Sequence, residues 1–171
     1  CMLNDQAIGA NYVLRNEKAN RVLIIDLDVH QGNGTAEIFK NDSRVFTFSM
    51  HGAKNYPIRK EKSDLDIGLE DGCKDEDYLA LLIKHLNVVI KKFSPDFIFY
   101  QAGVDVLATD NLGRLGLTKE GCKRRDQYVL EFAQREQIPS VVCMGGGYSP
   151  NIKDIIEAHT NTFKIAQQIF L

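Results

Sequence analysis

The segment VLIIDLDVHQGNG at residues 22–34 places two carboxylates and an imidazole directly after a run of apolar residues. Asp26, Asp28 and His30 stand at every second position. In an extended chain such residues point to the same side, so these three groups can face one site while the residues between them pack behind. Burying an unpaired charge is costly. The three groups therefore need partners, which can be other side chains, water or a metal ion.

Two other apolar segments also end in polar residues, because QAGVD ends at Asp105 and GGGY ends at Tyr148. In a parallel α/β sheet, ligands bind outside the carboxyl ends of the strands, so we expect these segment ends to meet at one edge. Asp105 would then complete a set of two carboxylates and one imidazole. Three protein ligands with an open position are typical of catalytic zinc. The same donors suit Fe(II) or Mn(II), so the spacing leaves the metal open.

Each of these features has a plainer interpretation when it is taken alone. The Asp-x-Asp-x-His run could be a phosphate or Mg²⁺ site or a polar strand end, and Asp105 could cap a turn. The glycines Gly145–Gly147 could cradle a phosphate or form a tight turn, and Tyr148 could be a packed aromatic residue. Their occurrence at the ends of successive apolar segments favours one shared site.

The elements that must position these groups follow from the spacing of apolar residues. Strands are predicted at residues 21–28, 44–50, 96–103 and 140–144, with an edge strand at 64–69 and a polar loop at 51–64. Helices are predicted at residues 3–17, 35–41 and 75–93. A fourth helix is predicted to begin after an N-cap at Thr118 and to end at about residue 136. The last helix is predicted to begin with Ser149 as its N-cap and Pro150 at its first position. One side of the last helix carries Ile152, Ile155, Ile156, His159, Phe163 and Ala166. This alternation predicts an α/β layered fold with a mainly parallel sheet, in a single domain over residues 1–171.

Composition disfavours several classes of protein. The net charge is −2, which gives no electrostatic footprint for DNA or RNA, and we interpret the short KRR at 123–125 as a solvated helix face. No apolar run approaches the ~20 residues of a membrane span, and the start shows no secretory signal pattern. The four cysteines show no C-x-x-C spacing, so neither a disulfide framework nor a cysteine zinc site is indicated. These features favour an intracellular, cytoplasmic protein.

The motifs as a set resemble the histone deacetylase superfamily of metal-dependent amidohydrolases. The matching segments are DLDVHQGNGT (26–35), FSMH (48–51), YQAGVDVLATDNLGRLGLT (100–118) and MGGGY (144–148), in family order and spacing. HQGNG, EDGCKDEDYL and DNLGRLGLT are most similar to class IV deacetylases and their bacterial relatives. The resemblance implies a three-layer arginase/deacetylase-like fold. It also implies hydrolysis of acetyl-lysine in a peptide, or of a small acetylated amine.

The resemblance implies roles for individual residues. Asp28, His30 and Asp105 match the catalytic metal ligands, normally zinc, and Tyr148 matches the tyrosine that hydrogen-bonds the substrate carbonyl and then the oxyanion. Asp26 matches an acid that orients a catalytic histidine. Asn33 stands where many relatives have an Asp paired to the second histidine, and an Asn can still accept that hydrogen bond.

Two monovalent-cation sites are also implied by the resemblance. A structural potassium site would use the backbone carbonyls of Asp26, Asp28, His30 and Met50 with the hydroxyl of Ser49. A second site would use the carbonyls of Phe39, Asp42 and Val45.

The histidines depart from the family pattern. Family members carry a His-His acid/base pair upstream of the position of Cys1, whereas His30, His51, His85 and His159 are all separate. We interpret the last three as structural or rim residues. We therefore expect a C-terminal portion of the fold, with the first strands missing and little activity alone. The alternative hypotheses are a non-catalytic deacetylase-like domain for binding or assembly, and a phosphate-binding α/β domain that uses the glycine run.

Overall fold

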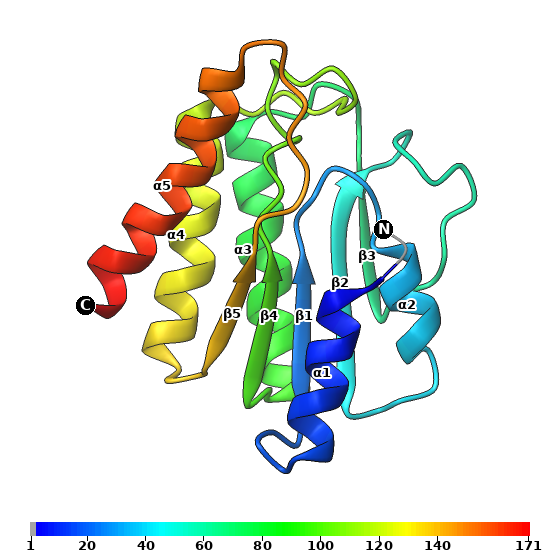
Figure 1. Ribbon diagram of the computed structural model, residues 1–171. Helices are drawn as coiled ribbons and strands as arrows, with labels where there is room; N and C mark the ends of the chain where they lie inside the picture. The colour runs from blue at the N-terminus through cyan, green and yellow to red at the C-terminus, as the bar shows by residue number, and fades with distance from the viewer. Residues whose placement is uncertain (1–2) are drawn as a thin grey trace.

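A parallel five-stranded sheet organises residues 3–171, which are the residues that the computed structural model describes; Cys1 lies outside them. The strand order is β3-β2-β1-β4-β5 (Figure 1). The strands are β1 (Val22–Asp26), β2 (Val45–Gly52), β3 (Leu65–Leu69), β4 (Phe97–Gln101) and β5 (Ser140–Cys143). All four neighbouring pairs are parallel, which confirms the predicted sheet and the edge position of residues 64–69.

Helices cover both faces of this sheet, so the fold has three layers (Figure 1). They are α1 (Asp5–Arg15), α2 (Asn33–Phe39), α3 (Asp75–Phe93), α4 (Lys119–Arg135) and α5 (Ile152–Phe170). Alternate residues of β1 serve the two layers, as expected for a strand buried on both faces. Leu23 and Ile25 pack in the core that includes α3 and α4, whereas Val22 and Ile24 pack in a smaller core with α1.

The apolar stripe of α3 shows how the sequence specifies the larger core. Its buried positions recur at helical spacing: Tyr78, Leu79, Leu82, Leu86, Val89 and Phe93. Asp75, Glu76 and Asp77 occupy the first turn and Lys91 and Lys92 the last, where each sign of charge is favoured by the helix dipole. The predicted helix at 75–93 is therefore confirmed, with the same bounds.

The last helix differs from its prediction in both cap and orientation. Asn151, not Ser149, is the N-cap, and its side chain accepts a hydrogen bond from the Lys153 N–H. The Ser149 hydroxyl is instead 2.8 Å from the hydroxyl of Thr109. Of the six residues predicted to share one side of this helix, His159 is buried, Ile155 and Ala166 are partly buried, and three are more than half exposed: Ile152, Ile156 and Phe163. The buried positions of α5 are Ala158, His159, Thr162 and Ile165, because a small and polar face packs against α4.

The interpretation of residues 123–125 as a solvated face is wrong for one of them. Arg125 has no exposed surface, and its neighbour Asp126 has none either. Their side chains form a buried ion pair, with Arg125 Nη2 2.7 Å from Asp126 Oδ1. Burial is possible because a partner of opposite charge stands beside the guanidinium.

None of the helices within residues 3–171 combines the length and the apolar character that a membrane span requires. Cys73, Cys122 and Cys143 are free thiols. Burial raises the pKa of the Cys122 thiol to about 12, so this side chain behaves as a small apolar core residue.

Candidate metal centre

Three side chains predicted to converge do meet at the carboxyl edge of the sheet. Strand β1 ends at Asp26, earlier than predicted, and the chain continues through Asp28 and His30. His30 Nδ1 lies 3.1 Å from Asp28 Oδ1 and 3.1 Å from Asp105 Oδ2. One ligand atom from each of the three residues lies within 4.8 Å of the others. The spacing i, i+2 therefore brings Asp28 and His30 together, and the next strand supplies the third donor.

Asp105 is the most enclosed member of this donor cluster of Asp28, His30 and Asp105. It has no exposed surface and follows the end of β4 by four residues. Its Oδ1 accepts a hydrogen bond of 2.9 Å from the Val29 N–H, between the two other donors. That bond leaves Oδ2 directed at His30. Asp105 therefore does not simply cap a turn, because its carboxylate connects the segments that follow β1 and β4.

The glycine run after β5 closes the cluster from a third direction. The Gly146 N–H donates a hydrogen bond of 2.9 Å to Asp28 Oδ2, and its carbonyl accepts one of 2.7 Å from the Val104 N–H. A Cβ at Gly146 would lie 2.1 Å from Asp105 Oδ2, so only glycine allows this approach. A phosphate held by this run would meet two carboxylates, which disfavours the phosphate-binding hypothesis.

The electrostatics of the cluster favour a cation between the carboxylates. Hydrogen bonds that the His30 imidazolium donates to the carboxylates of Asp105 and Asp28 raise the pKa of His30 to about 10. Burial raises the pKa of Asp105 to about 6, with a further contribution from the charge of Asp28. Burial also opposes ionisation of Asp28, but hydrogen bonds from His30 and Gly146 outweigh it and lower that pKa. A metal ion fits this donor set of two carboxylate oxygens and one imidazole nitrogen.

Asp26 does not join the cluster. Its Oδ1 accepts a hydrogen bond of 3.1 Å from the Asp28 N–H, and a Cβ at Gly32 would lie 2.3 Å from its Oδ2. Burial raises the pKa of Asp26 well above its usual range, and the charge of Asp28 raises it further. The side chain thus lies against the turn before α2. The geometric expectation that Asp26, Asp28 and His30 share one site is correct for the last two only.

Tyr148 follows the glycine run and remains half exposed, at 49%. Its backbone N–H donates a hydrogen bond of 2.6 Å to Asp110 Oδ2. Partial burial raises the pKa of the phenol, and the charges of Asp105, Asp28 and Asp110 add to the rise. The hydroxyl therefore stays protonated near neutral pH and is able to donate a hydrogen bond.

Asp110 was not identified from the sequence. Besides Tyr148 it binds the N–H groups of Leu112 and Gly113 through Oδ1, each at 2.8 Å. The run Asp-Asn-Leu-Gly at 110–113 carries the composition of an Asx turn, which is the signal that could have identified it. Asp110 joins the loop after β4 to the loop that carries Tyr148.

The residues assigned to potassium lie on neighbouring strands. Ser49 is opposite Asp26 in the β1–β2 register, and Met50 beside it is fully buried. The Ser49 hydroxyl is 2.9 Å from His51 Nδ1. Potassium binding here remains a prediction.

The other predicted positions lie around α2. Asn33 is the first residue of this helix, is partly buried, and donates its N–H to the Gln31 carbonyl at 2.8 Å. In the turn from α2 to β2, the Asp42 N–H donates to the Phe39 carbonyl and the Val45 N–H to the Asp42 carbonyl. Their roles as a histidine partner and as a second cation site remain predictions.

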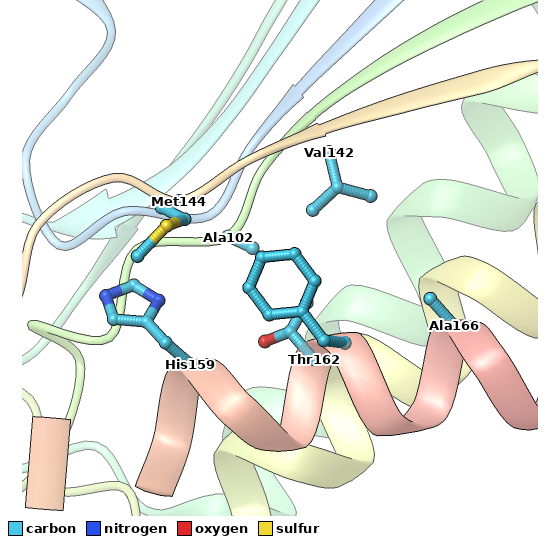
Figure 2. A pocket seen from close by; sticks show the side chains of 7 residues that line it. Ala102, Val142, Met144, His159, Thr162 and Ala166 are labelled. Atoms are coloured by element: carbon cyan, nitrogen blue, oxygen red, sulfur yellow. The ribbon is translucent and has the colours of Figure 1, made fainter. Parts of the chain in front are cut away.

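The remaining histidines lie away from the cluster. His51 is buried in β2 and bound to Ser49, and His85 is partly buried on α3. His159 is 8% exposed and lines a small apolar pocket between α5 and the sheet, together with Met144 and Thr162 (Figure 2). This pocket includes none of the three donors. The interpretation of these histidines as packed residues agrees with their burial.

Comparison with known proteins supports the resemblance. The sequence model of the histone deacetylase domain matches residues 1–163. An uncharacterized protein of Picosynechococcus sp. is 44% identical over 170 residues, which cover 99% of this chain and 57% of that protein. Histone deacetylase 2 of Arabidopsis thaliana is 32% identical over 159 residues, which cover 91% of this chain and 41% of the relative. The chain thus spans about half the length of the curated relatives it matches.

Solved structures give the same result for the fold. The crystal structure of the HDA15 HD domain matches with a TM-score of 0.80 and 29% identity, over 98% of this chain and 51% of that one. Acetylpolyamine aminohydrolase from Burkholderia pseudomallei matches with a TM-score of 0.82 over 99% of this chain and 51% of that one. The identity to it is 24%, so this match supports the fold alone. The predicted arginase/deacetylase-like fold is confirmed, and the chain belongs to the histone deacetylase family.

Proposed function

We propose that this chain carries the metal-binding part of a zinc-dependent deacylase site. The observation that carries the proposal is the donor cluster of Asp28, His30 and Asp105, with Tyr148 two residues after Gly146, which binds Asp28. The proposed reaction is hydrolysis of an amide, in which water replaces an amine on an acyl carbon.

The three donors would hold zinc and leave a coordination position open. When bound, the metal would polarise the acyl carbonyl and lower the pKa of its water toward ~7. Fe(II) suits the same ligands, so the test includes both metals. Asp105 holds its geometry through the bond to the Val29 N–H, and Asp28 through the bond from the Gly146 N–H.

Tyr148 would donate its hydroxyl proton in a hydrogen bond to the acyl oxygen. The interaction should strengthen as negative charge develops on that oxygen, because the donor is fixed in advance. Asp110 holds the backbone of Tyr148 and so sets the direction from which the phenol enters.

The donor cluster and Tyr148 do not supply the general base and general acid that the proposed hydrolysis needs. Asp26 and Asn33 are proposed as partners of imidazoles near the cluster, and Asp26, Ser49 and Met50 as part of a structural potassium site. His51 and His159 are packed elsewhere. We therefore propose that the 171-residue chain alone turns over substrate slowly.

The names of the similar proteins support the proposed substrate class. One is a histone deacetylase and another is an acetylpolyamine aminohydrolase, so both names refer to an acetylated amine. The amide is the same in both cases, so the test uses an acetyl-lysine peptide and an acetylated polyamine. Because Tyr148 and the donor cluster contact only the acyl end in this proposal, the cluster itself does not select between them.

The decisive experiment measures acetate release from both substrates, with zinc or Fe(II), with and without a chelator. It compares the 171-residue chain with the product of the complete reading frame. We expect chelator-sensitive hydrolysis by that product and little by the chain. Chelator-insensitive hydrolysis would exclude the metal mechanism, and rapid hydrolysis by the chain would exclude the slow-turnover proposal.

A non-catalytic domain is the second candidate, and the separation of the four histidines along the sequence favours it. It predicts that neither protein releases acetate, although the donor cluster still binds zinc. Reading the codons upstream of residue 1 for an adjacent histidine pair gives an independent check.

A further inference from the structure

Arg125 of α4 is a charged residue in the buried interior, and the proposed reaction does not use its side chain. It is the largest side chain with no exposed surface, and its charge is balanced by Asp126 through contacts of 2.8 Å from Nε and 2.7 Å from Nη2. Replacing such a buried pair by apolar residues is often neutral or stabilising. Stability alone therefore gives a weak account of this pair.

The third nitrogen of the guanidinium, Nη1, binds the backbone of the two segments that carry the donor cluster. Nη1 donates hydrogen bonds to the Leu27 carbonyl at 3.1 Å and to the Gly103 carbonyl at 2.6 Å. Leu27 directly precedes Asp28, and Gly103 stands two residues before Asp105. The β1–β4 register ends at Asp26 and Gln101, so this nitrogen joins the two segments beyond the end of their ladder.

The spacing of these two segments determines where the donors lie. A Cβ at Gly103 would lie 2.4 Å from Asp28 Oδ2, so the backbone of one segment contacts the ligand side chain of the other. A shift of Gly103 relative to Leu27 would move Asp28 relative to Asp105. One nitrogen that binds both carbonyls opposes that shift.

Asp126 anchors the guanidinium to the rest of the fold. Its Oδ1 accepts a hydrogen bond of 2.5 Å from the Tyr100 hydroxyl of β4. Its Oδ2 accepts one of 2.6 Å from Thr162, on the face of α5 that Figure 2 shows. Arg125 is thus held from β4, α4 and α5 at the same time, and its planar fork can bind the carboxylate and the two carbonyls together.

We propose that Arg125 is a positioning residue for the metal centre, which fixes the separation of the segments that carry Asp28, His30 and Asp105. The inference rests on the proposed metal site and adds a residue to it. Residues that orient metal ligands from behind typically contribute about 10- to 100-fold in metal affinity.

The test compares zinc affinity with stability in variants of the chain. Arg125→Lys keeps the charge beside Asp126, but an ammonium cannot reproduce the fork that reaches both carbonyls. Arg125→Met removes every contact. Val129→Ala opens a cavity in the buried face of the same helix without touching Arg125 or Asp126. This variant is the matched control for lost stability.

Zinc dissociation constants come from competition with a chromophoric chelator, and free energies of unfolding from urea titration without metal. We expect both Arg125 variants to bind zinc about 10- to 100-fold more weakly, while Val129→Ala binds zinc like the unsubstituted chain despite its lost stability. The ligand-field spectrum of bound Co²⁺ should change in the Arg125 variants only. If Arg125→Met does not fold, the zinc affinity of Arg125→Lys still tests the proposal.

Two results would overturn the proposal in different ways. Arg125 would be only a structural residue if zinc affinity followed the free energy of unfolding across the three variants. The same would hold if Arg125→Lys bound zinc like the unsubstituted chain. Failure of the unsubstituted chain to bind zinc would overturn the metal site and the role of Arg125 together.

Discussion

The backbone N–H of Gly146 donates a 2.9 Å hydrogen bond to Asp28 Oδ2, although 118 positions separate the two residues. The bond joins the loop after β5 to the segment after β1. It places the residues that lead into Tyr148 directly against a proposed metal ligand. The donor cluster and the loop that carries Tyr148 are therefore joined directly.

Gly146→Ala should weaken zinc binding by about 10-fold or more, because the new Cβ would push against the Asp105 carboxylate that the site uses. The added carbon would stand 2.1 Å from Asp105 Oδ2 and 3.0 Å from Asp28 Oδ2. Gly34→Ala is the control, since its Cβ would find its nearest neighbour at 3.8 Å. Chelator competition measures both, and equal zinc affinity in the two variants would contradict the prediction.

Asp105→Asn should weaken zinc binding by more than about 100-fold, which exceeds the usual effect of residues behind the ligands. The amide oxygen can still accept the bond from the Val29 N–H, so the fold should persist. Asp64→Asn is a matched control, because Asp64 binds Thr47 near the beginning of β2. Zinc content after gel filtration checks the outcome, and retention of zinc by Asp105→Asn would speak against this ligand.

Tyr148→Phe should lower kcat by about 10²–10³ in the form of the protein that releases acetate, because a preorganised donor to the developing oxyanion is lost. Zinc affinity should not change, since the hydroxyl is not among the three donors. Steady-state hydrolysis of the acetyl-lysine peptide and zinc titration measure the two quantities. An unchanged kcat would remove the tyrosine from the proposed chemistry.

Much of this site could be predicted from the sequence, because its donors follow directly after apolar segments that read as strands. Asp28 and His30 are two positions apart just after the end of β1, and Asp105 lies four residues after the end of the neighbouring strand β4. Parallel strands bring such ends together whatever the details of packing. The convergence of these donors therefore needed only the strand pattern.

Arg125 shows where sequence reasoning was insufficient. A Lys-Arg-Arg run on a helix usually marks a solvated face, and Lys123 and Arg124 fit that expectation. Arg125 is buried because its partners are the carbonyls of Leu27 and Gly103, which are remote in sequence. The orientation of α5 escaped prediction for the same reason, since the Thr162 bond to Asp126 depends on a neighbouring helix.

Asp96 lies at the end of the sheet opposite the donor cluster, and its carboxylate should make part of the stability depend on pH. Partial burial opposes its ionisation, but hydrogen bonds from the N–H groups of Arg21 and Asn20 outweigh it and lower its pKa. The folded chain therefore binds this proton less readily than the unfolded chain. The resulting stabilisation is present above the unfolded pKa of about 4 and is lost as the pH falls through the folded pKa.

Asp96→Asn should accordingly lower the free energy of unfolding at pH 7 by about 1 kcal/mol, a modest value because solvent screens this partly exposed group. The difference from the unsubstituted chain should shrink as the pH falls below about 4. Urea titrations across this range measure it, with the exposed Glu131→Gln as control. A difference that stays constant with pH would contradict the assignment.

The central claim is that zinc binds between Asp28, His30 and Asp105, and anomalous diffraction at the zinc edge tests it most directly. Crystals of the chain grown with one equivalent of zinc should show a single anomalous peak, about 2.0–2.2 Å from one atom of each residue. Crystals of Asp105→Asn grown in the same way should lack it. A zinc peak held by other residues, or no peak at this cluster in the unsubstituted chain, would contradict the account.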